Sequence, residues 1–195
     1  SILVGTSLLA ASLMLGSCGE KAEKAQEPAA FVTIKGQDLI KPDGTKLFIM
    51  GTNLGNWLNP EGYMFKFSKT NSPRFINEMF CQLVGPDFTA EFWKAFKDNY
   101  ITREDVQFIK NTGANTIRLP FHYKLFTDED FMGLTANQDG FARVDSVVEW
   151  CREADLYLIL DMHDAPGGQT GDNIDDSYGY PWLFESETSQ QLYCD

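Results

Sequence analysis

The sequence has 195 residues and a formal net charge of −12, and 43% of its residues are hydrophobic. That apolar fraction can form a folded core, which excludes a wholly disordered chain. The negative charge argues against nucleic acid as a partner, because phosphate groups attract basic surfaces.

Residues 1–17 carry no charged side chain and are rich in leucine, which is typical of a secretory signal peptide. They lead into Leu15-Gly16-Ser17-Cys18, which resembles the lipobox of bacterial lipoproteins. We therefore expect Cys18 to be lipidated and to anchor the protein in the bacterial outer membrane, on its periplasmic or cell-surface side. The alternative is a transmembrane helix, for which this stretch is short. Residues 18–30 are predicted to form a flexible tether.

Residues 31–35 alternate apolar and polar side chains, and residues 47–50 form a second β-like run. The turn composition of residues 42–45 predicts a small β-hairpin that leads into a strand near residues 49–53. Apolar side chains recur at helical spacing in residues 74–83 and 87–100. Thr102 and Asp105 resemble a capping box at the start of another helix, which Gly113 ends.

Residues 114–163 read as strand, loop, helix and strand. Residues 114–120 and 156–163 are apolar runs, and residues 141–153 between them are amphipathic. Polar side chains gather at the carboxyl ends of both strands, which is typical of a (β/α)8 barrel. A doubly wound sheet fits the alternation too, but residues 52–57 lack the glycine-rich phosphate loop that it would require.

Arg118 and His163 are the candidates for chemistry at these strand ends. An unpaired buried charge is costly, so Arg118 must face a carboxylate or a polar ligand, with a structural salt bridge as the alternative. By strand alternation, Asp161 and His163 point to one side and Met162 to the other. This pair indicates a site, and a core histidine satisfied by a carboxylate is the alternative.

The DMHD string at residues 161–164 also fits a hydrolase metal site, but the other histidine, His122, lies on a different loop. Residues 172–176 are acidic enough for calcium but fail the EF-hand pattern, so we expect a solvated loop. No zinc spacing occurs, and we assign neither a metal nor a cofactor. Three cysteines after Cys18 leave at least one free thiol, or a partner elsewhere.

Aromatic side chains in the predicted loops suit stacking on sugar rings, with core packing as the alternative. They are Trp57, Tyr63, Tyr123, Tyr178, Tyr180 and Trp182.

Several motifs occur in a fixed order: Asn53-Leu54-Gly55-Asn56-Trp57, then Glu61 and Tyr63, then Ile117-Arg118-Leu119-Pro120 with Tyr123, then Asp161-Met162-His163 with Ala165-Pro166-Gly167, Gln169, Gly171 and Asp172-Asn173. In this order they resemble glycoside hydrolase family 5, the cellulase and β-glucanase family, and most closely its exo-β-1,3-glucanase branch. The resemblance covers the chain from about residue 31 to its end. It implies an α/β fold, a (β/α)8 TIM barrel of which only the first three βα units are present, with an N-terminal β-hairpin.

The resemblance also implies roles. Arg118 would hydrogen-bond the nucleophilic glutamate, and His163 would contact the sugar being cleaved. The substrate-binding residues would be Asn53, Trp57, Glu61, Tyr63, His122, Tyr123, Asp172 and Asn173. His122 and Asp164 replace small residues of the branch, and the loop at 169–172 is one residue shorter, so linkage preference and exo or endo action stay open.

The family hydrolyses glycosidic bonds with retention, using two carboxyl groups about 5 Å apart. Its catalytic glutamates lie at the ends of the fourth and seventh strands, so we assign no catalytic residue to this chain. Residues 161–195 hold eight acidic side chains and no lysine or arginine, an imbalance that we expect of a fragment. The fragment itself should be inactive and should form an open, partial barrel with apolar edges.

We therefore expect the N-terminal part, residues 31–195, of a lipid-anchored barrel that hydrolyses a β-glucan. One alternative is a non-catalytic carbohydrate-binding lipoprotein on the same scaffold. Another is a metal-dependent deacetylase or phosphoesterase that uses the DMHD string.

Overall fold

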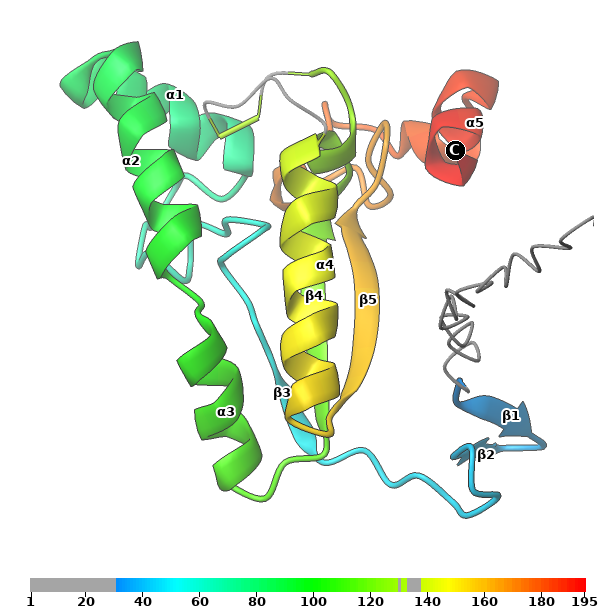
Figure 1. The fold of residues 1–195 in the computed structure, drawn as a ribbon. Helices are drawn as coiled ribbons and strands as arrows, with labels where there is room; N and C mark the ends of the chain where they lie inside the picture. Colours follow the sequence, from blue (N-terminus) through cyan, green and yellow to red (C-terminus); the bar gives the residue numbers. More distant parts are fainter. Residues whose placement is uncertain (1–30, 130, 133–137) are drawn as a thin grey trace, which may run out of the picture. The chain divides into compact units, whose positions relative to one another are not determined.

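The computed structural model describes residues 31–129, 131–132 and 138–195 (Figure 1). It divides into two compact units, one ending at Leu47 and the other spanning Phe48–Asp195. The expected signal peptide, the lipidation site Cys18 and the tether lie outside the described residues. Among the residues that are described, no helix has both the length and the apolar character needed to cross a bilayer.

The first unit contains a β-hairpin. Strand β1 (Thr33–Lys35) pairs antiparallel with β2 (Asp38–Ile40). Gly36 begins the connection with φ 64°, a conformation that glycine adopts at little steric cost. The predicted N-terminal hairpin is confirmed, but its second strand is β2 rather than residues 47–50. The short connection at Gly36 pairs β2 with β1. The predicted turn at residues 42–45 brings Lys46 opposite Ile40 on the next segment.

The second unit is built on an open parallel sheet with the strand order β3-β4-β5. These strands are β3 (Gly51–Asn53), β4 (Thr116–His122) and β5 (Tyr157–Asp164). The register places Asn53 opposite Arg118 and Arg118 opposite Ile159. The carboxyl ends of the strands therefore lie along one edge of the sheet, as the sequence predicts for part of a barrel.

Three helices connect β3 to β4: α1 (Pro73–Val84), α2 (Pro86–Asn99) and α3 (Arg103–Asn111). The hydroxyl of Ser72 accepts a hydrogen bond from the Phe75 amide (3.2 Å) at the start of α1. The predicted capping box starts α3, where Asp105 Oδ2 accepts from the Thr102 amide at 2.8 Å. Such caps satisfy N–H groups that have no partner inside a helix.

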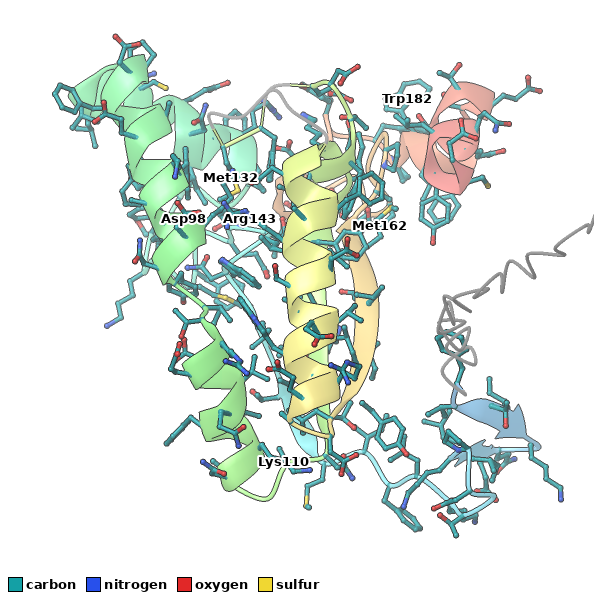
Figure 2. The ribbon with its side chains drawn as sticks, in the orientation of Figure 1. Asp98, Lys110, Met132, Arg143, Met162 and Trp182 are labelled. Atoms are coloured by element: carbon teal, nitrogen blue, oxygen red, sulfur yellow. The ribbon has the colours of Figure 1, made fainter. Side chains whose placement is uncertain are left out.

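Helix α4 (Gln138–Glu153) returns the chain from β4 to β5, after the short 3-10 helix η1 (Tyr123–Phe126). Its Val147 and Cys151 are buried against the sheet and α3. Its Arg143 forms an ion pair with Asp98 of α2, with 2.6 Å between Nη2 and Oδ1 (Figure 2). This βαβ crossover is the unit that the sequence predicts.

The core of the second unit joins α1, α2, α3 and α4 to the sheet. Ile117 and Leu119 of β4 are fully buried in it. Met162 packs against the same core, on the side of β5 opposite to that of Asp161 and His163, as the alternation predicts.

After β5, a loop leads through η2 (Asn173–Asp175) and η3 (Trp182–Phe184) to α5 (Glu187–Cys194). The hydroxyl of Ser186 accepts a hydrogen bond from the Ser189 amide (3.2 Å) and caps α5. All three described cysteines, Cys81, Cys151 and Cys194, are free thiols.

Candidate functional site

Three polar side chains meet at the carboxyl ends of β4 and β5. Arg118 Nη2 donates a hydrogen bond to Asp161 Oδ2 (2.5 Å) and lies 3.1 Å from His163 Nδ1. His163 Nδ1 lies 3.0 Å from the same Asp161 oxygen. The three side chains are between 27% and 38% exposed, so a ligand can reach them. The sequence-based prediction that Asp161 and His163 share a face is confirmed.

A β-bulge in β5 interrupts the pairing with β4 at His163. Asp164 pairs with His122 in the register, whereas His163 has no partner there. A bulge adds a residue to one strand and interrupts the pairing there. His163 contacts Arg118 and Asp161, whereas the next residue, Asp164, accepts a hydrogen bond from the buried Asn59. The side chain of Gln169 holds the bulge, since it donates to the His163 carbonyl and accepts from the Ala165 amide.

Arg118 pairs with a carboxylate and keeps part of its guanidinium available. Its ion pair with Asp161 is a structural salt bridge. Within the described residues, however, its hydrogen bonds engage one of its three nitrogens, Nη2. A guanidinium has five N–H donors in a planar fork, so the others can bind a polar ligand such as a sugar hydroxyl.

Glu61 lies in the loop after β3 and interacts with this cluster. It is 5% exposed, and burial raises the pKa of its carboxyl group. The charge on His163, a hydrogen bond from Tyr63 and the charge on Arg118 oppose that rise. Asn56 Oδ1 accepts a hydrogen bond from the Glu61 amide (3.0 Å) and fixes the loop. Glu61 thus joins the cluster as expected, with the exposed ring of Tyr63 beside it.

Asn53 and Trp57, also predicted to contact substrate, lie in different environments. Asn53 ends β3 opposite Arg118 and is exposed. Trp57 is 1% exposed, its indole N–H donates to the Lys97 carbonyl (2.8 Å), and its ring stacks on Trp150. The expectation of a direct sugar contact is therefore corrected for Trp57, because stacking requires an accessible ring face.

His122 ends β4, opposite Asp164 at the bulge in β5, and Tyr123 follows it at the start of η1. His122 is fully buried, so the expected substrate contact is corrected there as well. Its ring stacks on that of Tyr123, with 5.0 Å between centroids. Burial raises the pKa of the Tyr123 phenol, whose O–H donates to Glu129 (3.4 Å). Tyr123 is half-buried and remains a candidate for substrate contact.

The loop after β5 is organised by a buried aspartate. Asp175 accepts hydrogen bonds from the amides of Gln169 (2.8 Å), Thr170 (2.5 Å) and Ser177 (3.2 Å). Asp175 and Asp176 are 4% and 8% exposed, so the prediction of a solvated acidic loop is wrong for this pair. The backbone amides satisfy the carboxylate, which allows its burial.

Asp172 lies on the rim of a neighbouring hollow of about 530 Å³, formed by this loop and the start of α1. There the Arg74 guanidinium lies over the rings of Phe75 and Tyr178, 4.3 and 4.2 Å from their centroids. Tyr178 is 71% exposed and can offer a ring face to a ligand. Asn173 begins η2, and its side chain lies outside the described part of the structure.

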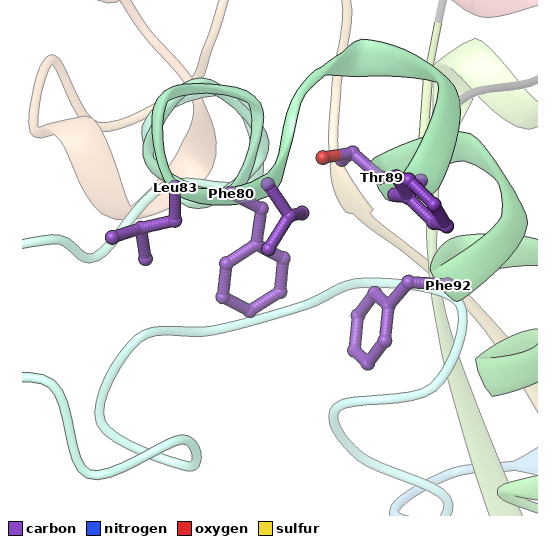
Figure 3. Close-up of a pocket in the computed structure, with 6 residues that line it drawn as sticks. Phe80, Leu83, Thr89 and Phe92 are labelled. Carbon is purple, nitrogen blue, oxygen red and sulfur yellow. The ribbon is translucent and has the colours of Figure 1, made fainter.

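A second hollow, of about 700 Å³, lies between α1 and α2 (Figure 3). It is apolar, and none of the predicted site residues lines it; its walls are Phe80, Leu83, Val84, Phe88, Thr89 and Phe92. Without groups that could bind or transfer protons, this hollow is not a candidate for chemistry.

Sequence reasoning missed three buried residues beneath the site, namely Asn59, Asp164 and Asp176. The one available signal was that Asp164 stands where the family that the sequence resembles has a glycine. Nothing in the sequence marked Asn59, because its role depends on the loop path after β3. Within the described ranges, no group of three or more histidine, cysteine, aspartate or glutamate side chains could hold a metal ion.

Comparison with known proteins gives a family match. The family described as Cellulase (glycosyl hydrolase family 5) matches residues 75–190. A beta-xylosidase of Phanerodontia chrysosporium is 32% identical over 73% of this chain and 29% of its own length. A glucan 1,3-beta-glucosidase of Kluyveromyces lactis is 31% identical over 63% of this chain and 30% of its own. The chain thus spans about a third of these relatives.

A solved structure, that of a rutinosidase from Aspergillus niger, shares the fold. It superposes with a TM-score of 0.57 over 73% of this chain and 40% of its own, at 23% sequence identity.

Proposed function

The chain belongs to glycosyl hydrolase family 5, and from this premise we propose that it is the N-terminal part of a lipid-anchored (β/α)8 barrel that hydrolyses a β-glucan with retention. The proposal extends the family membership in three respects: the substrate, the catalytic residues and the membrane anchor.

The observation that carries the proposal is the cluster of Arg118, Asp161 and His163 at the carboxyl ends of two parallel strands. Active sites of (β/α)8 barrels lie at this end. The cluster offers a positive charge and a ring nitrogen beside the buried Glu61. These groups can donate to and accept from sugar hydroxyls, and the nearby charge of Arg118 would keep an approaching carboxylate ionised.

A β-glucan is the proposed substrate because the chain is similar to a protein named as a glucan 1,3-beta-glucosidase. The accessible rings of Tyr63 and Tyr178 support it, since aromatic rings stack on the apolar faces of sugars. We propose that Tyr63, Tyr123, Glu61 and Asn53 contact one sugar, and that Asp172 and Asn173 contact it or its neighbour.

Retaining hydrolysis needs an acid and a nucleophile on opposite sides of the scissile bond. We propose that two glutamates on further strands of the barrel supply them, and that Arg118 hydrogen-bonds the nucleophile. The residues of this chain bind and orient the sugar and hold the nucleophile in its charged form. The chain by itself is expected to be inactive.

The open sheet supports the proposal of further strands. Parallel sheets are normally covered on both faces. In β5, however, Ile159 is 39% and Leu160 52% exposed. Additional βα units beside β5 would bury these side chains and close the barrel.

The proposal is tested with the protein extended to the length of its relatives. Purified protein is incubated with β-1,3-, β-1,4- and β-1,6-glucans, and released reducing sugar is measured. We expect turnover of at least one of them. Arg118→Ala should lower kcat/KM at least ~100-fold, because it removes a charge that acts where charge develops in the reaction.

Arg103→Ala is the matched control. Arg103 lies on α3, is largely exposed and forms an ion pair with Glu153, so its loss should leave turnover unchanged. Full activity of the Arg118→Ala protein would refute the role of that residue. Saturable oligosaccharide binding without turnover of any glucan would instead favour a non-catalytic carbohydrate-binding lipoprotein.

A further inference from the structure

Three buried polar side chains connect the strand ends beneath the site. Asn59 follows β3, His122 ends β4 and Asp164 ends β5, and each is at most 1% exposed. Asn59 Nδ2 donates a hydrogen bond to Asp164 Oδ1 (3.0 Å), and His122 Nε2 lies 3.7 Å from Asp164 Oδ2. Within the described residues, Asp164 Oδ2 has no hydrogen-bond partner.

The geometry fixes His122 as a neutral ring. Its Nδ1 accepts a hydrogen bond from the Lys124 amide at 3.1 Å. A nitrogen that accepts cannot carry a proton, so the proton lies on Nε2 and the ring is not an imidazolium. Burial also lowers the pKa of His122. Asp164 therefore has no cation on the imidazole side.

The nearby cations contact another carboxylate. Lys124 Nζ lies 3.5 Å from Asp176 Oδ2, and Arg74 Nε lies 3.6 Å from Asp176 Oδ1. The Arg74 amide donates to the same carboxylate (3.2 Å), and His122 Nε2 faces it at 3.4 Å. A hydrogen bond from the neutral His122 ring, the charge on Lys124 and the hydrogen bond from the Arg74 amide keep the pKa of Asp176 low despite its burial.

Among the described residues, Asp164 thus faces neutral or negative groups. Asn59 of the β3 loop and His122 of β4 are neutral. Asp176 and Asp175 of the following loop and Glu61 of the β3 loop are carboxylates that oppose its ionisation. The remaining charged group near His122, Glu129, is acidic as well. Burial, with these charges, raises the pKa of Asp164 to about 8.

We propose that Asp164 is a protonated positioning residue: its hydrogen bond with Asn59 and its packing beside the His122 ring hold together the three strand ends that carry Glu61, Arg118 and His163. Its protonation is independent of the function proposed above, whereas its positioning role rests on it. Burying a neutral carboxyl group costs far less than burying a carboxylate without a cation, and a carboxylate in its place would destabilise the cluster.

The consequence is that the folded state at this site becomes less stable as the pH rises. In the unfolded chain, Asp164 loses its proton near pH 4, and in the folded chain near pH 8. The folded state therefore binds more protons between these values, and its stability falls as the pH rises through this window. Above about pH 8, the carboxylate is buried beside Asp176 without a cation of its own.

The test compares wild type with Asp164→Asn by thermal unfolding of the whole chain between pH 4 and pH 9. The amide has the shape of the carboxylic acid and does not ionise. The Tm of the variant minus that of wild type should increase with pH, by about 4 °C or more over this window. Titrating groups that do not interact with Asp164 cancel in the difference.

Asp176→Asn is the matched control, because Asp176 is a buried carboxylate that is ionised. Its contribution to stability is present above about pH 4 and lost below it, so this variant should lower the Tm by a nearly constant amount across the pH range of the experiment. A constant Tm difference for Asp164→Asn, or one that shrinks as the pH rises, would overturn the proposal.

The positioning role is tested by hydrogen–deuterium exchange at pH 9, which measures how fast the backbone amides near Asp164 open to solvent. Amides in residues 165–178 should exchange at least ~3-fold faster in wild type than in Asp164→Asn, with both proteins measured at the same pH. Equal exchange in this segment would refute the positioning role. Neither measurement uses a sugar or turnover, so its failure is distinct from a failure of the proposed hydrolase.

Discussion

Lys97 shows how the environment of a residue, rather than its type, sets its behaviour. Its side chain is fully buried where α2 meets α4, with Nζ 3.7 Å from Asp139 Oδ2. Burial lowers the pKa of Lys97 to about 8, although Asp139 partly opposes this. The helical pattern of α2 gives no sign of a buried lysine, because the residue that covers it lies on α4. Only the packing of the two helices reveals it.

Lys97→Met should stabilise the protein at pH 7 by about 2 kcal/mol, because it removes a buried charge whose pKa is lowered. Wild type should gain stability as the pH rises from about 8 to about 10.5, since the unfolded state there binds the extra proton. The advantage of the variant should therefore shrink, as urea unfolding at pH 7 and pH 10.5 would measure. Lys94→Met, at an exposed position of the same helix, should show no such change. An unchanged gap for Lys97→Met would contradict the account.

At the scale of elements, local sequence signals predicted most helices and strands. The capping box at Thr102 acts within one helical turn, so tertiary structure was not needed to find it. The predicted hairpin strand was wrong because the connection at Gly36 pairs β2 with β1, while the turn at residues 42–45, which also forms, adds only an isolated bridge between Ile40 and Lys46. The apolar spacing that predicts a helix over residues 87–100 identifies the buried face of α2 only in part. Trp93 is fully buried against α1, whereas Phe88 is 67% exposed.

Trp93→Ala should destabilise the protein by about 3–5 kcal/mol, because it removes a buried ring and leaves a cavity. The indole also donates to Asn77 Oδ1 (2.9 Å) and contacts Phe80, Phe92 and Phe96. Phe88→Ala on the same helix should change stability by less than about 0.5 kcal/mol. Guanidinium unfolding measures both variants, and equal losses would show that the α1–α2 pair does not pack as described.

At the scale of the whole molecule, we propose a membrane anchor at one end of the chain and a completed barrel at the other. The anchor rests on the apolar leader and on Cys18, with residues 18–30 as a tether long enough to separate the barrel from a lipid surface. Placement in the outer membrane, on either face, is part of the same proposal.

Cys18→Ala should abolish the incorporation of labelled palmitate and release the protein from the membrane fraction, when it is expressed with its whole leader in a Gram-negative bacterium. The reason is that the sulfur of this residue is the attachment point of the lipid. Cys81→Ala, at a free thiol of α1, should keep the label. Labelled Cys18→Ala protein would refute the anchor.

The sequence by itself determined the family resemblance, the βα order and the strand ends that carry Arg118 and His163, because these depend on local periodicity and on motif order. The tertiary structure alone decided which polar residues are exposed. It buried Trp57 and His122, which the motifs had placed against substrate. It also brought Asn59, Asp164 and Asp176 beneath the site, although they lie far apart in the chain. The physical reason is that burial and charge pairing arise from contacts between distant segments. Because of those contacts, Asp176 is ionised, whereas we propose that Asp164 beside it is neutral.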